Sequence, residues 1–350
     1  MIDRTAQRLA MLDDLVQQAR DGDPIRVAVV NAAQAAMLET LRDALRLGIA
    51  EPVLIGRSVE IAEVATTLGW NLEPASVIEA DSEADAARHG VEFVRDGHAD
   101  ALKNGHIHTD AFMRALLDGE HGLRQPGNCV SHVFLMDIPS CPRLFTITDA
   151  EVNNMADLNA KTQILQNAIT LMQMVGVETP RAAVISAVES VNPVIVSTLD
   201  AACLAVMARR GQNTGAEVDG PLALDNAISE RAVREKGIDP STAGQADILL
   251  MPDLVSGNVL AKNLEYRAGA TAAGVVMGLT VPVVLSSRVD PPKTRLAGLA
   301  VAAWMYRAGI RLPTPTAPET ESAFHCAPQP ESACFPQGGV LMDTLALACH

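Results

Sequence analysis

The sequence predicts an α/β protein whose β-sheets are mainly parallel, and three observations support this prediction. Short β-branched runs alternate with helical patterns along most of the chain, which is typical of parallel sheets covered by helices. The alternation starts afresh after a long helical segment at Asp157–Met174, and two rounds predict two such layers with a cleft between them. The chain has 350 residues, which suits two domains of roughly 150 residues each.

The first round begins with a strand at Ile25–Val30 and a helix over Ala33–Leu47 that has one apolar face. An amphipathic helix is expected before them, with Leu12 and Leu15 on its apolar side. The round continues with strands at Pro52–Ile55, Ser76–Glu79 and Ala99–Lys103 and helices at Val59–Leu68 and Ala84–Arg95. Two strands close together in sequence, Val130–Asp137 and Arg143–Thr148, predict an antiparallel excursion at the edge of the sheet.

The second round contains a near-continuous apolar run, ADILLM at Ala246–Met251, which is typical of a strand buried on both faces. The expected strands are Arg181–Ala187, Glu217–Val218, Ala246–Met251 and Val281–Ser286. The expected helices are Thr198–Arg209, Asp225–Lys236, Val255–Arg267, Ala270–Gly278 and Lys293–Arg307.

The composition changes from Pro313 onward. The segment 313–350 is rich in proline and has no Lys or Arg. This composition predicts a disordered tail without a role in catalysis, the alternatives being a partner-binding or an appended segment.

Charge and composition argue against several classes of protein. The 27 Lys and Arg stand against 42 Asp and Glu, and the net charge of −15 has the wrong sign for a nucleic-acid binder. No apolar stretch approaches the ~20 residues that cross a bilayer, so no membrane association is expected. The six cysteines are scattered without a CxxC pair, which indicates the reducing cytoplasm, and Cys203 in the run DAACLAVM is expected to be buried. His106 and His108 form an HxH pair without a third ligand, so no metal site is expected.

Polar side chains follow three of the predicted strands, at the edge where open α/β sheets bind ligands. The first group follows Val218, where Asp219-Gly220-Pro221 predicts a turn and Asp225 begins the next helix. A substrate-binding role for Asp219 is one interpretation. A plain turn followed by a helix cap is the other.

The second group follows the strand ADILLM. Gly257 and Asn258 allow close backbone approach, and Lys262 lies one helical turn beyond Asn258. Such a group suits a phosphate or a carbonyl oxygen. Alternatively, Lys262 is an ordinary solvated lysine.

The third group is Ser286-Ser287-Arg288 with Asp290, directly after the buried strand that begins at Val281. A hydroxyl, a guanidinium and a carboxylate can together stabilise an oxyanion, hold a phosphate and accept a proton. The alternative is a Ser/Asp turn before a helix whose first turn contains Pro291 and Pro292. The chain has no GxGxxG after a strand, no GxxxxGK[ST] and no GxSxG, so the common phosphate loops and the nucleophile elbow lack support.

Five segments, taken in order, resemble blocks of the phosphate acetyl/butyryltransferase family. They are ALKNGHIHTDAFMRALL at Ala101–Leu117, SAVESVNPVIVSTLDA at Ser186–Ala201, GAEVDGPLALDNAIS, GQADILLMPDLVSGNVLAKNL and PVVLSSRVDPPKTRLA. The first segment is a weaker match than the other four. The resemblance covers about Ile25 to Ile310, and the forms VNP…STLDA and VDGPLALDNAIS are closer to the butyryl branch.

This resemblance implies reversible transfer of an acyl group between coenzyme A and inorganic phosphate. Acyl-CoA, phosphate and acyl phosphate would be the ligands, and coenzyme A would be a substrate and product without any tightly bound cofactor. The family commonly forms homo-oligomers. It also implies two three-layer α/β/α domains of the isocitrate/isopropylmalate dehydrogenase type, with the active site in the cleft. The first would comprise 1–150 plus 283–312, and the second, inserted domain 151–282.

The resemblance also implies roles for individual residues. Ser287 and Arg288 match the family's Ser-Arg pair, in which serine contacts the reacting acyl or thiol centre and arginine holds phosphate. Arg114 matches an N-terminal arginine, a second candidate for phosphate binding. Asp219, Gly257, Asn258 and Lys262 complete the substrate-binding candidates.

The general base follows the family pattern less closely. By the resemblance, the acetyl branch has its aspartate several residues beyond the Ser-Arg pair, near Thr294 of this chain. Asp290, two residues after Arg288, is the only nearby carboxylate here, and the butyryl-like pattern has a carboxylate at this position. Lys103-Asn104-Gly105 also carries one residue more than the family's usual Lys-Gly. Because these blocks contain no cysteine, we expect direct transfer without an acyl-enzyme.

Two other functions are compatible with such a fold. A non-catalytic sensor of acyl-CoA or acyl phosphate would have little need of both Ser287 and Arg288. An acyltransferase that takes its acyl group from a carrier protein is disfavoured, since the acidic surface would repel an acidic carrier.

Overall fold

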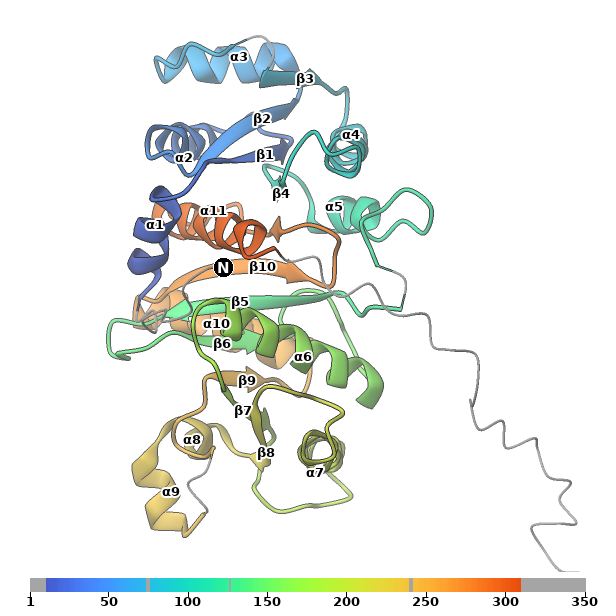
Figure 1. Ribbon diagram of the computed structural model, residues 1–350, viewed down its shortest axis with the longest axis vertical. Coiled ribbons are helices and arrows are strands. Elements are labelled where there is room, and N and C mark those ends of the chain that lie inside the picture. The colour runs from blue at the N-terminus through green and yellow to red at the C-terminus, as the bar shows by residue number, and fades with distance from the viewer. Residues whose placement is uncertain (1–10, 74–75, 126, 239–241, 310–350) are drawn as a thin grey trace, which may run out of the picture. The chain divides into compact units, whose positions relative to one another are not determined.

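A computed structural model describes residues 11–73, 76–125, 127–238 and 242–309 of the protein (Figure 1). The predicted tail at 313–350 lies outside these residues, as does the beginning of the expected N-terminal helix. The described part of that helix is α1 (Leu12–Arg20), and its Leu12 and Leu15 are buried as predicted.

The described strands form one sheet of eleven strands, in the order β3-β2-β1-β4-β11-β10-β5-β6-β9-β7-β8 (Figure 1). The strands are β1 (Ile25–Val30), β2 (Ala50–Gly56), β3 (Val77–Glu79), β4 (Ala101–Asn104), β5 (Ser131–Asp137), β6 (Phe145–Thr148), β7 (Arg181–Ile185), β8 (Glu217–Leu222), β9 (Ile248–Leu250), β10 (Thr271–Met277) and β11 (Val283–Val284). The mainly parallel α/β architecture predicted from the sequence is confirmed.

The sheet contains two parallel sets. Strands β3, β2, β1, β4 and β11 form one set, and β6, β9, β7 and β8 form the other. Between them, β10 and β5 pair antiparallel over seven residues, from Thr271 opposite Asp137 to Met277 opposite Ser131. The antiparallel strands therefore lie in the middle of the sheet, and the prediction that they form its edge was wrong, because β5 has β10 as a second antiparallel neighbour.

The helices lie close to their predicted positions, with three exceptions. They are α2 (Ala35–Arg46), α3 (Ser58–Thr67), α4 (Glu83–Arg95), α5 (Thr109–Leu116), α6 (Leu158–Met174), α7 (Val196–Arg209), α8 (Leu224–Ile228), α9 (Glu230–Lys236), α10 (Leu254–Ala268) and α11 (Pro292–Arg307). Helix α5 was not predicted. The predicted helix Asp225–Lys236 is two helices, because Ser229 has an extended backbone and caps α9 through its side chain.

The third exception is the predicted helix Ala270–Gly278, which is strand β10. Its alanines favour a helix locally, but β5 and β11 pair with its two edges, and residues from Ala272 to Met277 are buried. Tertiary pairing thus overrides a helix propensity worth less than about 1 kcal/mol per residue.

Helices cover both faces of the sheet, and alternate strand residues contribute to different core clusters. Val27 and Val29 pack with α2, α3 and α11, whereas Ala28 and Val30 pack with α4 and α5 on the other face. In the second set, α6 and α7 cover one face and α8, α9 and α10 the other. This layering is the three-layer arrangement expected. The division of the first 312 residues into two domains stays a prediction.

Two further findings concern single features. None of the described helices combines the length and apolar character needed to cross a bilayer. Cys203 was predicted to be buried, but it is exposed on α7, because its side chain falls on the face of the helix that points away from the sheet.

Candidate active site

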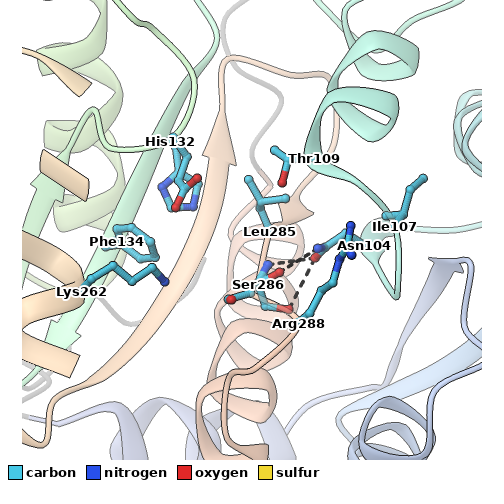
Figure 2. Close-up of a pocket in the computed structure, with 11 residues that line it drawn as sticks. Asn104, Ile107, Thr109, His132, Phe134, Lys262, Leu285, Ser286 and Arg288 are labelled. Carbon is cyan, nitrogen blue, oxygen red and sulfur yellow. Dashed lines mark hydrogen bonds between the residues drawn. The ribbon is translucent and has the colours of Figure 1, made fainter. Parts of the chain in front are cut away.

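Strands β4 and β11 are parallel neighbours, so the segments that follow them begin at the same edge of the sheet. A pocket of about 240 Å³ opens there. Its lining residues are Asn104, Ile107, Thr109, His132, Phe134, Glu151, Lys262, Leu285, Ser286, Ser287 and Arg288. Figure 2 shows His132, Phe134 and Lys262 on one side and Asn104, Ile107 and Arg288 on the other.

The end of β4 fixes the segment that follows β11. Lys103 Nζ donates to Ser286 Oγ at 2.7 Å. Asn104 Nδ2 donates to the Ser286 carbonyl at 2.7 Å, and its Oδ1 accepts from the Ser286 amide at 2.8 Å (Figure 2). Asn104 thus holds Ser286 through both its amide and its carbonyl.

Lys103 is completely buried, and its partner Ser286 lines the pocket. Burial lowers the pKa of its amine from 10.5 to about 7, and the nearby charge of Arg295 adds to the effect. The amine therefore exchanges its proton near neutrality instead of remaining permanently charged.

Ser287 and Asp290 close a tight turn. The Ser287 amide donates to Asp290 Oδ2 at 2.7 Å, and the Asp290 amide donates to the Ser287 carbonyl at 3.3 Å. Burial raises the pKa of the Asp290 carboxyl, against the opposing charges of Lys262, Lys103 and Arg295. Asp290 is not among the lining residues; it lies directly behind Ser287 and Arg288, which are. A carboxylate with a raised pKa next to a pocket is suited to accept and return a proton.

Arg288 presents an unpaired guanidinium. Its backbone carbonyl accepts from Arg295 Nη2 at 2.8 Å, but its side chain donates no hydrogen bond to a described residue. Arg288 also acts on Glu83: burial alone would raise the pKa of that carboxyl, but hydrogen bonds from His108 and the Arg288 charge lower it. A half-buried guanidinium with free N–H groups is suited to bind an oxyanion bidentately.

Lys262 provides the second cation of the pocket. Its Nζ lies 3.2 Å from Glu265 Oε2 and 5.6 Å from the centre of the Phe134 ring. Burial would lower the pKa of Lys262, but Glu265, Asp290 and Glu151 outweigh it and raise the pKa. Burial raises the pKa of both Glu151 and Glu265, so these carboxyls are protonated more easily than usual.

Gly257 and Asn258 support this pocket from outside its lining. Asn258 Nδ2 donates to the Ala150 carbonyl at 3.2 Å and to Glu151 Oε1 at 2.9 Å. A Cβ at Gly257 would collide with the Asp149 carbonyl oxygen, so glycine lets α10 approach this segment. Both residues thereby fix the position of Glu151.

The other two predicted residues lie elsewhere. Arg114 is exposed on α5 and is not among the lining residues. Asp219 lies within β8 and accepts from the Gly220 amide at 2.8 Å. The prediction that Asp219-Gly220-Pro221 forms a turn was wrong: β8 continues to Leu222, and Gly220 packs against Val184 of β7.

The sequence interpretation missed two buried polar residues of this site, Lys103 and His132. Both have an exposed fraction of 0%. Each lies in a predicted strand among apolar neighbours, and a charged or polar residue in such a run was the available signal.

Comparison with known proteins places this geometry in context. The family model described as phosphate acetyl/butyryl transferase matches residues 80–303. Phosphate acetyltransferase of Rickettsia felis is 43% identical over 84% of this chain and 84% of its own length. Phosphate butyryltransferase of Clostridium acetobutylicum is 38% identical over 83% of this chain and 96% of its own length.

Solved structures agree with these matches. A branched-chain phosphotransacylase from Enterococcus faecalis is 29% identical, covers 81% of this chain and 99% of its own, and has a TM-score of 0.69. A phosphotransacetylase from Streptococcus pyogenes, at 20% identity, covers 85% of this chain and 99% of its own with a TM-score of 0.71, a likeness of fold.

Proposed function

The chain belongs to the phosphate acetyl/butyryltransferase family, and we propose that it transfers an acyl group reversibly between coenzyme A and inorganic phosphate. The observation that carries this proposal is the free guanidinium of Arg288 beside the hydroxyl of Ser287, in a pocket that also holds Lys262. Such a site offers cations for phosphate and a hydrogen-bonding group for the acyl centre. The closer similarity of this chain to the butyryl branch of the family stays a prediction.

In this proposal the reaction needs positioning more than covalent chemistry. Arg288 and Lys262 hold phosphate, and Ser287 donates a hydrogen bond to the acyl or thiol centre. Holding both reactants in line can contribute ~7–11 kcal/mol towards the barrier. A phosphate oxygen bonds directly to the thioester carbon and the C–S bond then breaks, so no acyl-enzyme forms.

Asp290 is the proposed proton acceptor. In the reverse direction the coenzyme A thiol gives its proton to Asp290 and attacks the acyl phosphate as thiolate. The raised pKa of Asp290 supports this role, because it makes the carboxylate a stronger base than an ordinary aspartate. Arg114 and Asp219 keep the substrate-binding roles that the resemblance gives them as proposals, while Gly257 and Asn258 would act through Glu151.

The test is the release of free coenzyme A thiol from acetyl-, propionyl-, butyryl- and branched acyl-CoA, with and without phosphate. We expect release that depends strictly on phosphate. Arg288→Ala should abolish most of it, and Arg57→Ala, which removes an exposed arginine, is the matched control. Acyl-CoA binding without any turnover in the wild type would instead support a sensor.

We also propose that the protein is a homo-oligomer. Val255, Val259 and Tyr266 recur at helical spacing on α10 and are each more than 60% exposed. An apolar stripe on one helix face is typical of an interface. Light scattering after size separation should give more than one chain mass, and Val259→Glu should lower it.

The compartment proposed is the cytoplasm. Cys129, Cys141 and Cys203 are free thiols, which suits a reducing environment. Coenzyme A acts in this scheme as a substrate that leaves after each turnover.

A further inference from the structure

His132 is a buried polar residue that the proposed mechanism does not use. It lies on β5 in the middle of the sheet and has an exposed fraction of 0%. Neither ring nitrogen makes a well-formed hydrogen bond to a described residue, and the nearby Leu285 carbonyl has only the weakest of the three influences on the ring's pKa. Because buried polar groups are almost always hydrogen-bonded, a ring left without partners indicates that a ligand supplies one.

The ring faces the pocket. His132 and Phe134 line it together, with ring centres 4.3 Å apart in an edge-on arrangement. Figure 2 shows both rings on the side opposite Asn104 and Arg288, with Leu285 between.

Gly274 makes room for the ring on the neighbouring strand. A Cβ at this position would lie 2.8 Å from His132 Nε2 and would collide with the Leu285 carbonyl oxygen. Any larger residue at 274 would displace the imidazole or Leu285, which follows β11, so the glycine preserves the space that His132 occupies.

The surroundings of His132 determine which kind of ligand atom its ring can bind. Burial, together with the charge of Lys262, lowers the pKa of His132 to about 3, so the ring is neutral and has one N–H donor. The charged groups Arg288 and Lys262 suit a phosphate dianion better than this neutral ring does. A neutral donor beside Phe134, Ile107 and Leu285 suits a carbonyl oxygen with a short apolar chain attached.

We propose that His132 is a catalytic residue whose neutral ring donates a hydrogen bond to the acyl carbonyl oxygen of acyl-CoA and of acyl phosphate. This inference rests on the proposed function. As the phosphate oxygen bonds to the carbonyl carbon, the C=O electron pair moves to the oxygen, and the His132 N–H holds the resulting oxyanion. The pair returns when the C–S bond breaks, and the proton lost by phosphate reaches the sulfur through Asp290. His132 keeps its own proton throughout.

The test compares His132→Leu, which has no donor, with His132→Gln, which keeps a neutral N–H donor. In the thiol-release assay, His132→Leu should lower kcat by about 100- to 1,000-fold, the usual cost of one oxyanion-stabilising donor. The KM for phosphate should change less than about twofold, and His132→Gln should recover at least a tenth of the lost rate. The matched control is His121→Leu, which replaces an exposed histidine and should leave kcat unchanged.

Other results would overturn the proposal. A kcat of His132→Leu within threefold of the wild type would show that the ring only packs. A loss confined to the KM for phosphate would make His132 a phosphate ligand.

A second measurement does not depend on turnover or on the folding of a variant. The wild type is titrated with a ketone analogue of acyl-CoA in which a methylene group replaces the sulfur. The His132 ring N–H signal, followed by nuclear magnetic resonance, should shift with the ketone and stay unchanged with coenzyme A. A bound ketone without this shift would refute the role of His132. If the shift occurs but no acyl-CoA releases thiol with phosphate, the acyl site stands and the proposed function fails.

Discussion

Replacing Lys103 by methionine should change how the stability of the protein depends on pH. Burial lowers the pKa of Lys103 from 10.5 to about 7, with the Arg295 charge as the second cause. In the unfolded chain the amine is in water and regains its ordinary pKa. Methionine has a similar length and fills the same space without an ionisable group.

The sign follows from the protons bound in each state. Between about pH 7 and the ordinary pKa, the unfolded chain binds more protons at Lys103 than the folded protein, so wild-type stability rises with pH in this window. Lowering the pH towards 7 therefore lowers the stability of the wild type. Since one pKa unit corresponds to about 1.36 kcal/mol, the full difference is roughly 5 kcal/mol. Between about pH 7 and about pH 9 the increase in unfolding free energy is about 2 kcal/mol.

Urea unfolding of the wild type and of Lys103→Met across this pH range measures the effect. The unfolding free energy of the wild type minus that of the variant should rise by the stated amount, because titrating groups that do not interact with Lys103 cancel in the difference. The lost hydrogen bond to Ser286 Oγ lowers the variant's stability by about 1 kcal/mol and affects its pH dependence little. Lys293→Met, which removes an exposed lysine, is the control and should give a flat difference. A difference for Lys103→Met that is constant within about 0.5 kcal/mol would refute the depressed pKa.

Three further substitutions test the site. Arg288→Lys should raise the KM for phosphate about 10-fold or more, because lysine loses the bidentate fork, and an unchanged KM would remove Arg288 from phosphate binding. Asp290→Asn should lower kcat by about 100- to 10,000-fold and remove the limb of the pH–rate profile that reports its raised pKa. Its amide oxygen can still accept from the Ser287 amide, so the melting temperature should hold; a retained limb would assign the base elsewhere. Cys203→Ser should leave kcat unchanged, since this thiol is exposed on α7, and an acyl group trapped on Cys203 would contradict direct transfer.

The parts of the fold that follow from local pattern were predicted correctly. Strand β1 was predicted with its observed bounds, Ile25–Val30, because β-branched residues followed by a helical pattern are a local signal. The region of β10 was instead predicted to be a helix, because Ala-rich segments favour helices. The pairing that makes it a strand involves β5, more than 130 residues earlier in the sequence. The central position of the antiparallel strands depends on the same long-range pairing.

In the site, too, residues marked by a local pattern were predicted, whereas residues whose role depends on distant parts of the chain were not. Ser287, Arg288 and Asp290 are visible in sequence because they are polar residues directly after a buried strand. The structure places Ser287 and Arg288 in the pocket with Lys262, and Asp290 behind them, bonded to the Ser287 amide. Lys103 is visible in sequence only as part of a motif, since its role depends on burial and on Ser286, a partner 183 residues away. His132 was missed for a similar reason: only the fold shows that its ring nitrogens lack partners and face a pocket.

The protein has a net charge of −15, although the proposed ligands are anions. The carboxyl groups around Lys262 show how an acidic protein can still bind an anion. Its ammonium interacts with Glu265, Asp290 and Glu151, and burial raises the pKa of all three carboxyls. Before phosphate arrives, these carboxylates compensate a cation that would otherwise be costly to bury. If Lys262 binds phosphate as proposed, an arriving dianion competes with them for Lys262 and raises their pKa further, so protonation of this cluster favours phosphate binding. By thermodynamic linkage, phosphate must then favour protonation to the same extent. Under the proposed function, the acidic residues near this pocket therefore couple phosphate binding to the uptake of a proton, which the transfer reaction must deliver to sulfur.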